Sequence, residues 1–217
     1  MKIIFYGLWL ITIVAGSTLG TIVPPSAAYL TGFTAGSFAD VINSLDFTKV
    51  VIYDAHSNVT PALIDRVENR PNTMFVERTL LDIGDDNLVM YYPDEGAMKR
   101  YSENCQRPYS FGMKRRNWET GKILGVDIIN REIVKDKNIL IVDDICSKGG
   151  TFYHSAQALK DAGAADIYLF ITHCEDSIFK GSLLESGLIK HIYTTDSLGH
   201  DILFNKQITV YKLQEII

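Results

Sequence analysis

The segment from Ile139 to Phe152 constrains the fold more than any other stretch of this 217-residue chain. It begins with an unbroken apolar run, Ile139 to Val142, which is typical of a strand buried on both faces of a parallel sheet. Two carboxylates stand where we expect that strand to end, and Phe152, Ala156 and Leu159 then recur at helical spacing. Open α/β sheets bind ligands at the carboxyl ends of their strands, so this junction is the predicted site.

The loop between the strand and the helix has the chemistry of an anion site. Gly149 and Gly150 let main-chain N–H groups turn inward where a helix begins, and such a nest suits a phosphate. Ser147 and Thr151 add hydroxyl donors, and Lys148 adds positive charge.

Asp143 and Asp144 cannot bind the same phosphate, because like charges repel. They suit sugar hydroxyls or a divalent metal ion beside the phosphate. Phosphate donors next to a carboxylate pair therefore indicate a sugar phosphate. The alternative is a strand that ends in solvated acids before an ordinary glycine-containing turn.

The segment Val142 to Thr151 resembles the ribose-5-phosphate loop shared by type I phosphoribosyltransferases and phosphoribosyl pyrophosphate synthetases. It is not a Walker loop, because the Gly-Lys-Ser/Thr order is missing. The resemblance implies an α/β fold with a phosphoribosyltransferase-like parallel sheet flanked by helices, and an incomplete N-terminal α/β domain. It also implies that ribose 5-phosphate is bound by Asp143, Asp144, Ser147, Lys148, Gly149, Gly150 and Thr151.

The resemblance covers about residues 35–217 and suggests two domains. Residues 1–72 would be a truncated or divergent N-terminal synthetase-like domain, and residues 73–217 a phosphoribosyltransferase-like domain that carries the loop. Within the first, we expect a short helix between Asn58 and Asn72, closed by Arg70-Pro71.

Four outer segments resemble the synthetase branch, the ribose-phosphate diphosphokinases, and three of them are described first. Asp54-Ala55-His56-Ser57 is similar to an Asp-x-His segment, which implies that His56 helps to place a magnesium–ATP complex. Asp94, in a Pro-Asp segment, would be the second group near the Mg²⁺ cofactor; its alternative role is a helix N-cap. Thr172-His173 is also shared, and there we expect His173 to have a positioning role.

Lys114-Arg115-Arg116 resembles a synthetase segment at the base of a flexible loop over the substrates, here residues 117–122. The implied reaction transfers pyrophosphate from ATP to C1 of ribose 5-phosphate and gives phosphoribosyl pyrophosphate for nucleotide biosynthesis. Negative charge shifts onto phosphate oxygens in the transition state, and fixed cations stabilise it there. Lys114 and Arg116 are the predicted catalytic pair, since Arg115 points the other way in an extended segment.

The N-terminus favours two interpretations. Residues 3–39 contain no charged side chain, and the apolar run Ile3 to Ala15 follows a single lysine. It resembles the apolar region of a signal peptide and is short for a membrane span. Alternatively, Ile3–Tyr6 and Leu8–Val14 are buried strands. A need for cytosolic nucleotide favours a cytoplasmic location, with membrane contact only if the run is an anchor.

Composition excludes some partners. The net charge of −5 implies no basic surface for nucleic acid. Cys105, Cys146 and Cys174 have no paired spacing, which argues against a disulfide framework or a zinc site and fits a reducing compartment.

The chain departs from the synthetase pattern in two places. Synthetases carry an arginine-containing stretch and an acidic aromatic loop for adenine and triphosphate, and nothing in residues 1–40 matches either. Ser147 stands where many family members have a third acid.

Three functions remain open: a magnesium-dependent synthetase acting on ATP and ribose 5-phosphate, a phosphoribosyltransferase, and a non-catalytic subunit. The resemblance implies a homo-oligomer, or a hetero-oligomer with homologues.

Overall fold

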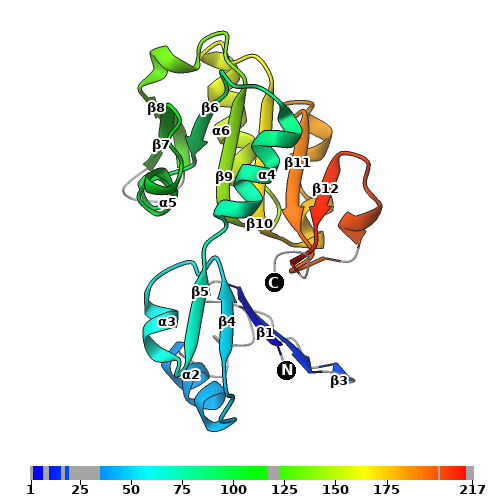
Figure 1. Ribbon diagram of the computed structural model, residues 1–217. Helices are drawn as coiled ribbons and strands as arrows, with labels where there is room; N and C mark the ends of the chain where they lie inside the picture. Colours follow the sequence, from blue (N-terminus) through cyan, green and yellow to red (C-terminus); the bar gives the residue numbers. More distant parts are fainter. Residues whose placement is uncertain are drawn as a thin grey trace. The chain divides into compact units, whose positions relative to one another are not determined.

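The computed structural model describes residues 2–6, 10–15, 18–19, 35–116, 123–199 and 201–213. The chain forms two compact units, Met1–Asn72 and Thr73–Ile217, which are described separately below (Figure 1). The division falls at the residue where the sequence suggests two domains. That the first unit is a truncated synthetase domain stays a prediction.

The first unit contains short strands and helices around a small apolar cluster. An antiparallel sheet is formed by β1, β2 and β3, and a separate parallel pair by β4 and β5. The cluster joins residues of α2 and β4 with Ala55 and Ile64. The bounds are β1 (Lys2–Tyr6), β2 (Leu10–Ala15), β3 (Thr18–Leu19), α2 (Ala35–Ser44), β4 (Val50–Tyr53), α3 (Val59–Leu63) and β5 (Val67–Arg70).

A helix was expected between Asn58 and Asn72, and this prediction is wrong beyond Leu63, where α3 ends. Val67 begins strand β5 instead, which pairs in parallel with β4. The edge of β4 offers main-chain partners to this segment, since the Asp54 N–H donates to the Arg70 carbonyl over 2.8 Å.

The apolar N-terminal run forms strands where the structure describes it, in β1 and β2. Among the described residues, no helix is both long and apolar enough to cross a membrane.

The second unit is built on a seven-stranded sheet in the order β12-β11-β10-β9-β6-β7-β8. Neighbouring strands run parallel, except for β7 and β8, which are antiparallel. The strands are β6 (Val89–Tyr92), β7 (Tyr109–Arg116), β8 (Ile123–Ile129), β9 (Ile139–Cys146), β10 (Ile167–Cys174), β11 (His191–Thr195) and β12 (Ile208–Tyr211). The helices are α4 (Thr73–Ile83), α5 (Glu95–Tyr101) and α6 (Gly150–Asp161), with 3-10 turns η2 (Ser102–Asn104), η3 (Arg131–Val134), η4 (Asp176–Lys180), η5 (Leu184–Ser186) and η6 (Asp201–Phe204).

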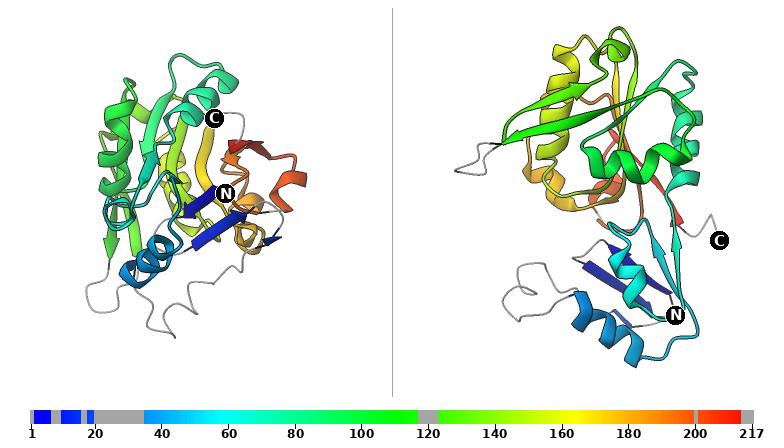
Figure 2. Two further views of the ribbon diagram at one scale, coloured as in Figure 1. Left: turned by 60° about the horizontal axis from the view of Figure 1, so that its bottom comes forward. Right: turned by 90° about the vertical axis from the view of Figure 1, so that its left-hand side faces the viewer.

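Helices cover both faces of this sheet (Figure 2). On one face, the predicted apolar stripe of α6, Phe152, Ala156 and Leu159, packs in a cluster with Ile139 and Ile141 of β9. The alternation of strand side chains sends neighbouring residues to the opposite face. There Phe75 of α4 stacks on Tyr211 of β12, and Tyr92 of β6 contacts Tyr101 of α5. The predicted α/β architecture is therefore confirmed.

Two details differ from the sequence-based expectation. The sheet is not parallel throughout, because the β7–β8 pair is antiparallel. The central strand also continues past Val142 to Cys146, since β10 pairs with it as far as Cys174. Asp143 and Asp144 therefore lie within the last part of β9 rather than after it.

We expect Leu159→Ala, on the buried face of α6, to lower the free energy of unfolding by about 2–5 kcal/mol, because the cavity replaces fully buried contacts. Gln157→Ala, at an exposed position of the same helix, should change it by less than about 0.5 kcal/mol. Urea unfolding followed by circular dichroism measures both. Equal effects of the two substitutions would contradict the packing of α6 described here.

Candidate functional site

The loop from Ser147 to Gly149 joins β9 to the N-terminus of α6. Gly149 is the N-cap residue and has φ 77° and ψ 11°, a left-handed conformation that a glycine adopts without steric cost. The first N–H groups of a helix have no partner within that helix, so the 12-residue α6 presents donors to an anion at this end.

A segment after β10, which contains Gly181 and Leu183, packs against this loop. A Cβ atom on Gly149 would lie within 2.9 Å of the Leu183 side chain. A Cβ atom on Gly181 would overlap the main-chain carbonyl of Lys148, so the two backbones are in close contact there. Gly181 and Leu183 were not predicted from the sequence, because their distance from the loop along the chain hides the contact.

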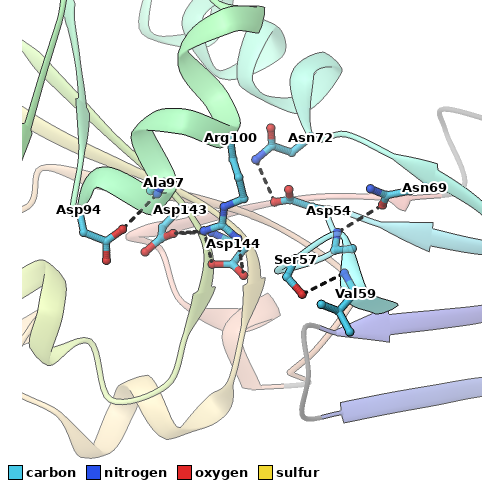
Figure 3. A network of polar contacts seen from close by, with 11 residues as sticks. Asp54, Ser57, Val59, Asn69, Asn72, Asp94, Ala97, Arg100, Asp143 and Asp144 are labelled. Atoms are coloured by element: carbon cyan, nitrogen blue, oxygen red, sulfur yellow. Dashed lines mark hydrogen bonds and ion pairs between the residues drawn. The ribbon is translucent and has the colours of Figure 1, made fainter. Parts of the chain in front are cut away.

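Asp143 and Asp144 lie at the end of β9 and both pair with Arg100 of α5 (Figure 3). Arg100 Nη1 and Nη2 each donate to a different oxygen of Asp144 over 3.3 Å, and Nη2 also donates to Asp143 Oδ1 over 3.4 Å. The Asp144 side chain is 3% exposed and that of Asp143 is 14% exposed. The alternative of fully solvated acids is therefore wrong for this strand end.

Burial sets the charge state of this group. It raises the pKa of Asp143 well above its ordinary value, and the neighbouring Asp144 raises it further, while Arg100 acts in the opposite direction. Burial alone would lower the pKa of Arg100, but Tyr101, Asp144 and Asp143 raise it above its usual value. Arg100 is therefore a permanent cation beside two closely spaced carboxyls.

Arg100 is the functional candidate that the sequence analysis did not identify. Its signal was present as a basic residue in the last turn of the helix that follows Asp94. What the sequence does not reveal is that β6, which leads into this helix, pairs directly with β9.

Asp94 and His56 belong to different units. Asp94 caps α5, since its Oδ1 accepts a hydrogen bond from the Ala97 N–H over 3.0 Å (Figure 3). The N-cap role is thus present, and the magnesium role stays a prediction. His56 follows β4 in the first unit and is exposed.

No cluster of three or more His, Cys, Asp or Glu side chains is placed to hold a metal ion within the part of the chain that the structure describes. Magnesium commonly binds one or two carboxylates together with water and substrate phosphates, so it does not require such a cluster. Asp94 fits this role in its donor chemistry, because carboxylate oxygens are ligands that magnesium commonly binds.

Lys114 and Arg116 lie on β7, whose pairing with β8 shifts in register between Arg115 and Arg116. Arg115, between them, forms an ion pair with Asp127 of β8 over 3.1 Å. The side chains of Lys114 and Arg116 and the predicted flap at 117–122 lie outside the described residues, so the catalytic pair stays a prediction.

His173 is fully buried at the end of β10, next to the central strand. Its Nδ1 lies 2.9 Å from Ser197 Oγ, which also bonds to the Thr172 carbonyl and to Thr195. This buried network favours the expected positioning role, since His173 ties the ends of β10 and β11 together.

Cys146 and Cys174 occupy paired positions on β9 and β10, and both thiols are free and buried. The neighbouring Cys174 and burial raise the pKa of Cys146 well above its ordinary value. A protonated thiol is a weak nucleophile, so Cys146 serves packing at the start of the loop.

Comparisons with known proteins show which sequences and which fold this chain is similar to. The model of the phosphoribosyl synthetase-associated domain family matches residues 129–216. The chain is 27% identical over 167 residues to a ribose-phosphate pyrophosphokinase of Porphyromonas gingivalis, covering 75% of this chain and 52% of the relative. It is 29% identical over 180 residues to that of Thermosipho africanus, covering 80% and 56%.

The fold is also similar to that of a solved protein. The crystal structure of phosphoribosylpyrophosphate synthetase from Mycobacterium smegmatis matches with a TM-score of 0.69 at 20% identity, over 84% of this chain and 60% of that one. The chain thus spans about half the length of the curated relatives that it matches.

We expect Gly181→Ala to weaken the binding of inorganic phosphate, because the added methyl group displaces the main chain of Lys148. Such overpacking costs about 1–3 kcal/mol of stability. Isothermal titration with phosphate and urea unfolding measure the two effects. Ser182→Ala, at the exposed neighbouring position, is the control and should change neither. Unchanged phosphate binding in a folded Gly181→Ala variant would separate this segment from the anion site.

Asp143→Asn is expected to raise the free energy of unfolding at neutral pH. The folded-state pKa of Asp143 lies above its unfolded value, so keeping the carboxylate ionised opposes folding at neutral pH. The advantage should shrink as the pH falls through the folded pKa and vanish below about 4, where the unfolded carboxyl is also protonated.

Urea unfolding between neutral and acidic pH tests this sign. Asp127→Asn, which removes an exposed carboxylate, should show no comparable gain at neutral pH. A lower stability of Asp143→Asn at neutral pH would mean that the bond to Arg100 outweighs the cost of burial.

Proposed function

We propose a function on the premise that this chain belongs to the phosphoribosyl pyrophosphate synthetase family, whose relatives match it in sequence and whose fold it shares. The proposed activity is that of a ribose-phosphate diphosphokinase. The C1 hydroxyl of ribose 5-phosphate attacks the β-phosphorus of ATP, the bond to the α-phosphate oxygen breaks, and AMP leaves. The product is phosphoribosyl pyrophosphate, a precursor for nucleotide biosynthesis.

One observation carries this proposal: a buried carboxylate pair precedes a glycine loop at a helix N-terminus. The main-chain N–H donors of Gly149, Gly150 and Thr151 suit the 5-phosphate. The Ser147 hydroxyl and the Lys148 ammonium are further donors in the same loop. The acids suit the ribose hydroxyls, which donate hydrogen bonds to a carboxylate. A phosphate without a sugar would have no use for the two acids as hydrogen-bond acceptors. A sugar without a phosphate would have no use for the N–H donors of the loop.

The chemical step requires groups that stabilise charge on the phosphate oxygens. Lys114 and Arg116 are the proposed cations, because their spacing of two residues in an extended strand favours a common face. Magnesium would be held by Asp94 and His56 and would supply charge neutralisation on the triphosphate. We further propose a cytoplasmic location, where ATP is present, and an oligomeric assembly, as in the family.

A second function is favoured by one observation. The matching family model is described as a synthetase-associated domain. A non-catalytic subunit that binds the sugar phosphate and joins an active homologue would account for it. No observation favours the phosphoribosyltransferase in the same way.

We expect AMP release that depends on both ATP and ribose 5-phosphate. Lys114→Ala and Arg116→Ala should each reduce the turnover number by about 10³-fold or more while ribose 5-phosphate still binds, because the cations act on charge that develops in the transition state. Coupled assay of AMP and titration of ribose 5-phosphate measure the two properties. Arg115→Ala is the matched control, since Arg115 pairs with Asp127 instead.

The outcomes separate the two functions. Binding of ribose 5-phosphate without AMP release, together with altered activity of an active relative on mixing, would establish the non-catalytic subunit. A chain that fails to bind ribose 5-phosphate would exclude both.

A further inference from the structure

Arg100 makes more hydrogen bonds to Asp144 than to Asp143. It meets both oxygens of Asp144 through its two terminal nitrogens, a bidentate contact, but only one oxygen of Asp143. A planar guanidinium matches a carboxylate in this way and fixes its orientation. Asp144 is therefore held more firmly than Asp143.

The exposure and the hydrogen bonds of the two acids also distinguish Asp143 from Asp144. The Asp144 carboxylate is 3% exposed, so little of it can meet a ligand, whereas that of Asp143 is 14% exposed. Asp143 Oδ1 also accepts the main-chain N–H of Asp144 over 3.0 Å. The hydrogen bonds that Asp143 accepts from Arg100 and from the Asp144 N–H therefore both fall on its Oδ1.

Arg100 is itself held in place. Its guanidinium carbon lies 5.1 Å from the ring centre of Tyr101, and its side chain is 24% exposed. Tyr101 packs against Tyr92 at the end of β6, the strand beside β9. The Arg100 guanidinium therefore contacts the acids from a packed helix, which restricts the movement of its side chain.

We propose that Arg100 is a positioning residue for ribose recognition, which clamps Asp144 and thereby leaves Asp143 as the carboxylate that receives the sugar hydroxyls. This inference rests on the proposed function, since it concerns the same site. It goes further in dividing the roles of the two acids, which the motif alone treats as equivalent. Arg100 acts through the acids and not on the phosphate.

The experiment compares the affinities of the full chain for ribose 5-phosphate, 2-deoxyribose 5-phosphate and inorganic phosphate by isothermal titration. The useful quantity is the sugar preference, the ratio of the dissociation constant of inorganic phosphate to that of ribose 5-phosphate. Arg100→Met should lower this preference about tenfold or more, because the acids lose their orientation. Its affinity for inorganic phosphate should stay within about twofold, since Arg100 does not act on the phosphate loop.

Two further variants separate positioning from simple loss of structure. Arg100→Lys keeps the charge but not the planar fork, so its sugar preference should lie between those of the wild type and Arg100→Met. The double variant Arg100→Met/Asp144→Asn removes the cation together with the more deeply buried acid, and the acid that remains, Asp143, is the more exposed of the two, so the variant should fold. Its sugar preference should be no lower than that of Arg100→Met alone, because the two residues act as one unit.

Lys99→Met is the matched control. Lys99 neighbours Arg100 on α5, but its side chain is exposed and pairs with Glu95 over 2.7 Å. It should keep the wild-type preference.

A folded Arg100→Met variant with the wild-type preference would overturn the inference, as would equal losses for all three ligands. A wild-type chain that binds ribose 5-phosphate no better than inorganic phosphate would instead overturn the proposed function.

Discussion

The buried contact between one guanidinium and two carboxylates is the interaction on which the candidate site depends. Two acids at the end of an inner strand repel each other, and burial raises the cost of their charge. Arg100 offsets this cost only because α5 begins directly after β6, and β6 is the strand that pairs with β9. The strand order of the sheet therefore decides whether the acids can remain at this position.

The proposed phosphate-binding loop depends on contacts of a different kind. Gly149 adopts a left-handed conformation against Leu183, and the main chain of Gly181 lies against that of Lys148. The loop is therefore shaped by backbone packing from a segment after β10, and the acids by an ion pair from α5. The acids and the loop meet at the junction of β9 and α6, so two separate sets of contacts support this junction.

Some expectations failed where a local pattern competed with pairing in the sheet. Residues after Leu63 were expected to be helical, but Val67–Arg70 pairs with the open edge of β4. The central strand was expected to end at Val142, but β10 continues to pair with it as far as Cys146. The sheet was expected to be parallel, but β8 follows β7 directly in the chain and pairs with it in the antiparallel direction. In the first two cases a segment further along the chain supplied the hydrogen bonds, and no local signal indicates such a partner.

The sequence by itself determined the α/β class, the apolar stripe of α6 and the residue types of the loop, because periodicity and glycine chemistry act over a few neighbouring residues. It also placed two acids next to phosphate donors, which already implies a sugar phosphate. Only the tertiary structure decided that Arg100 faces those acids and that Gly181 supports the loop. These contacts join segments far apart in the chain, and their geometry follows from strand order, which local residue patterns do not encode.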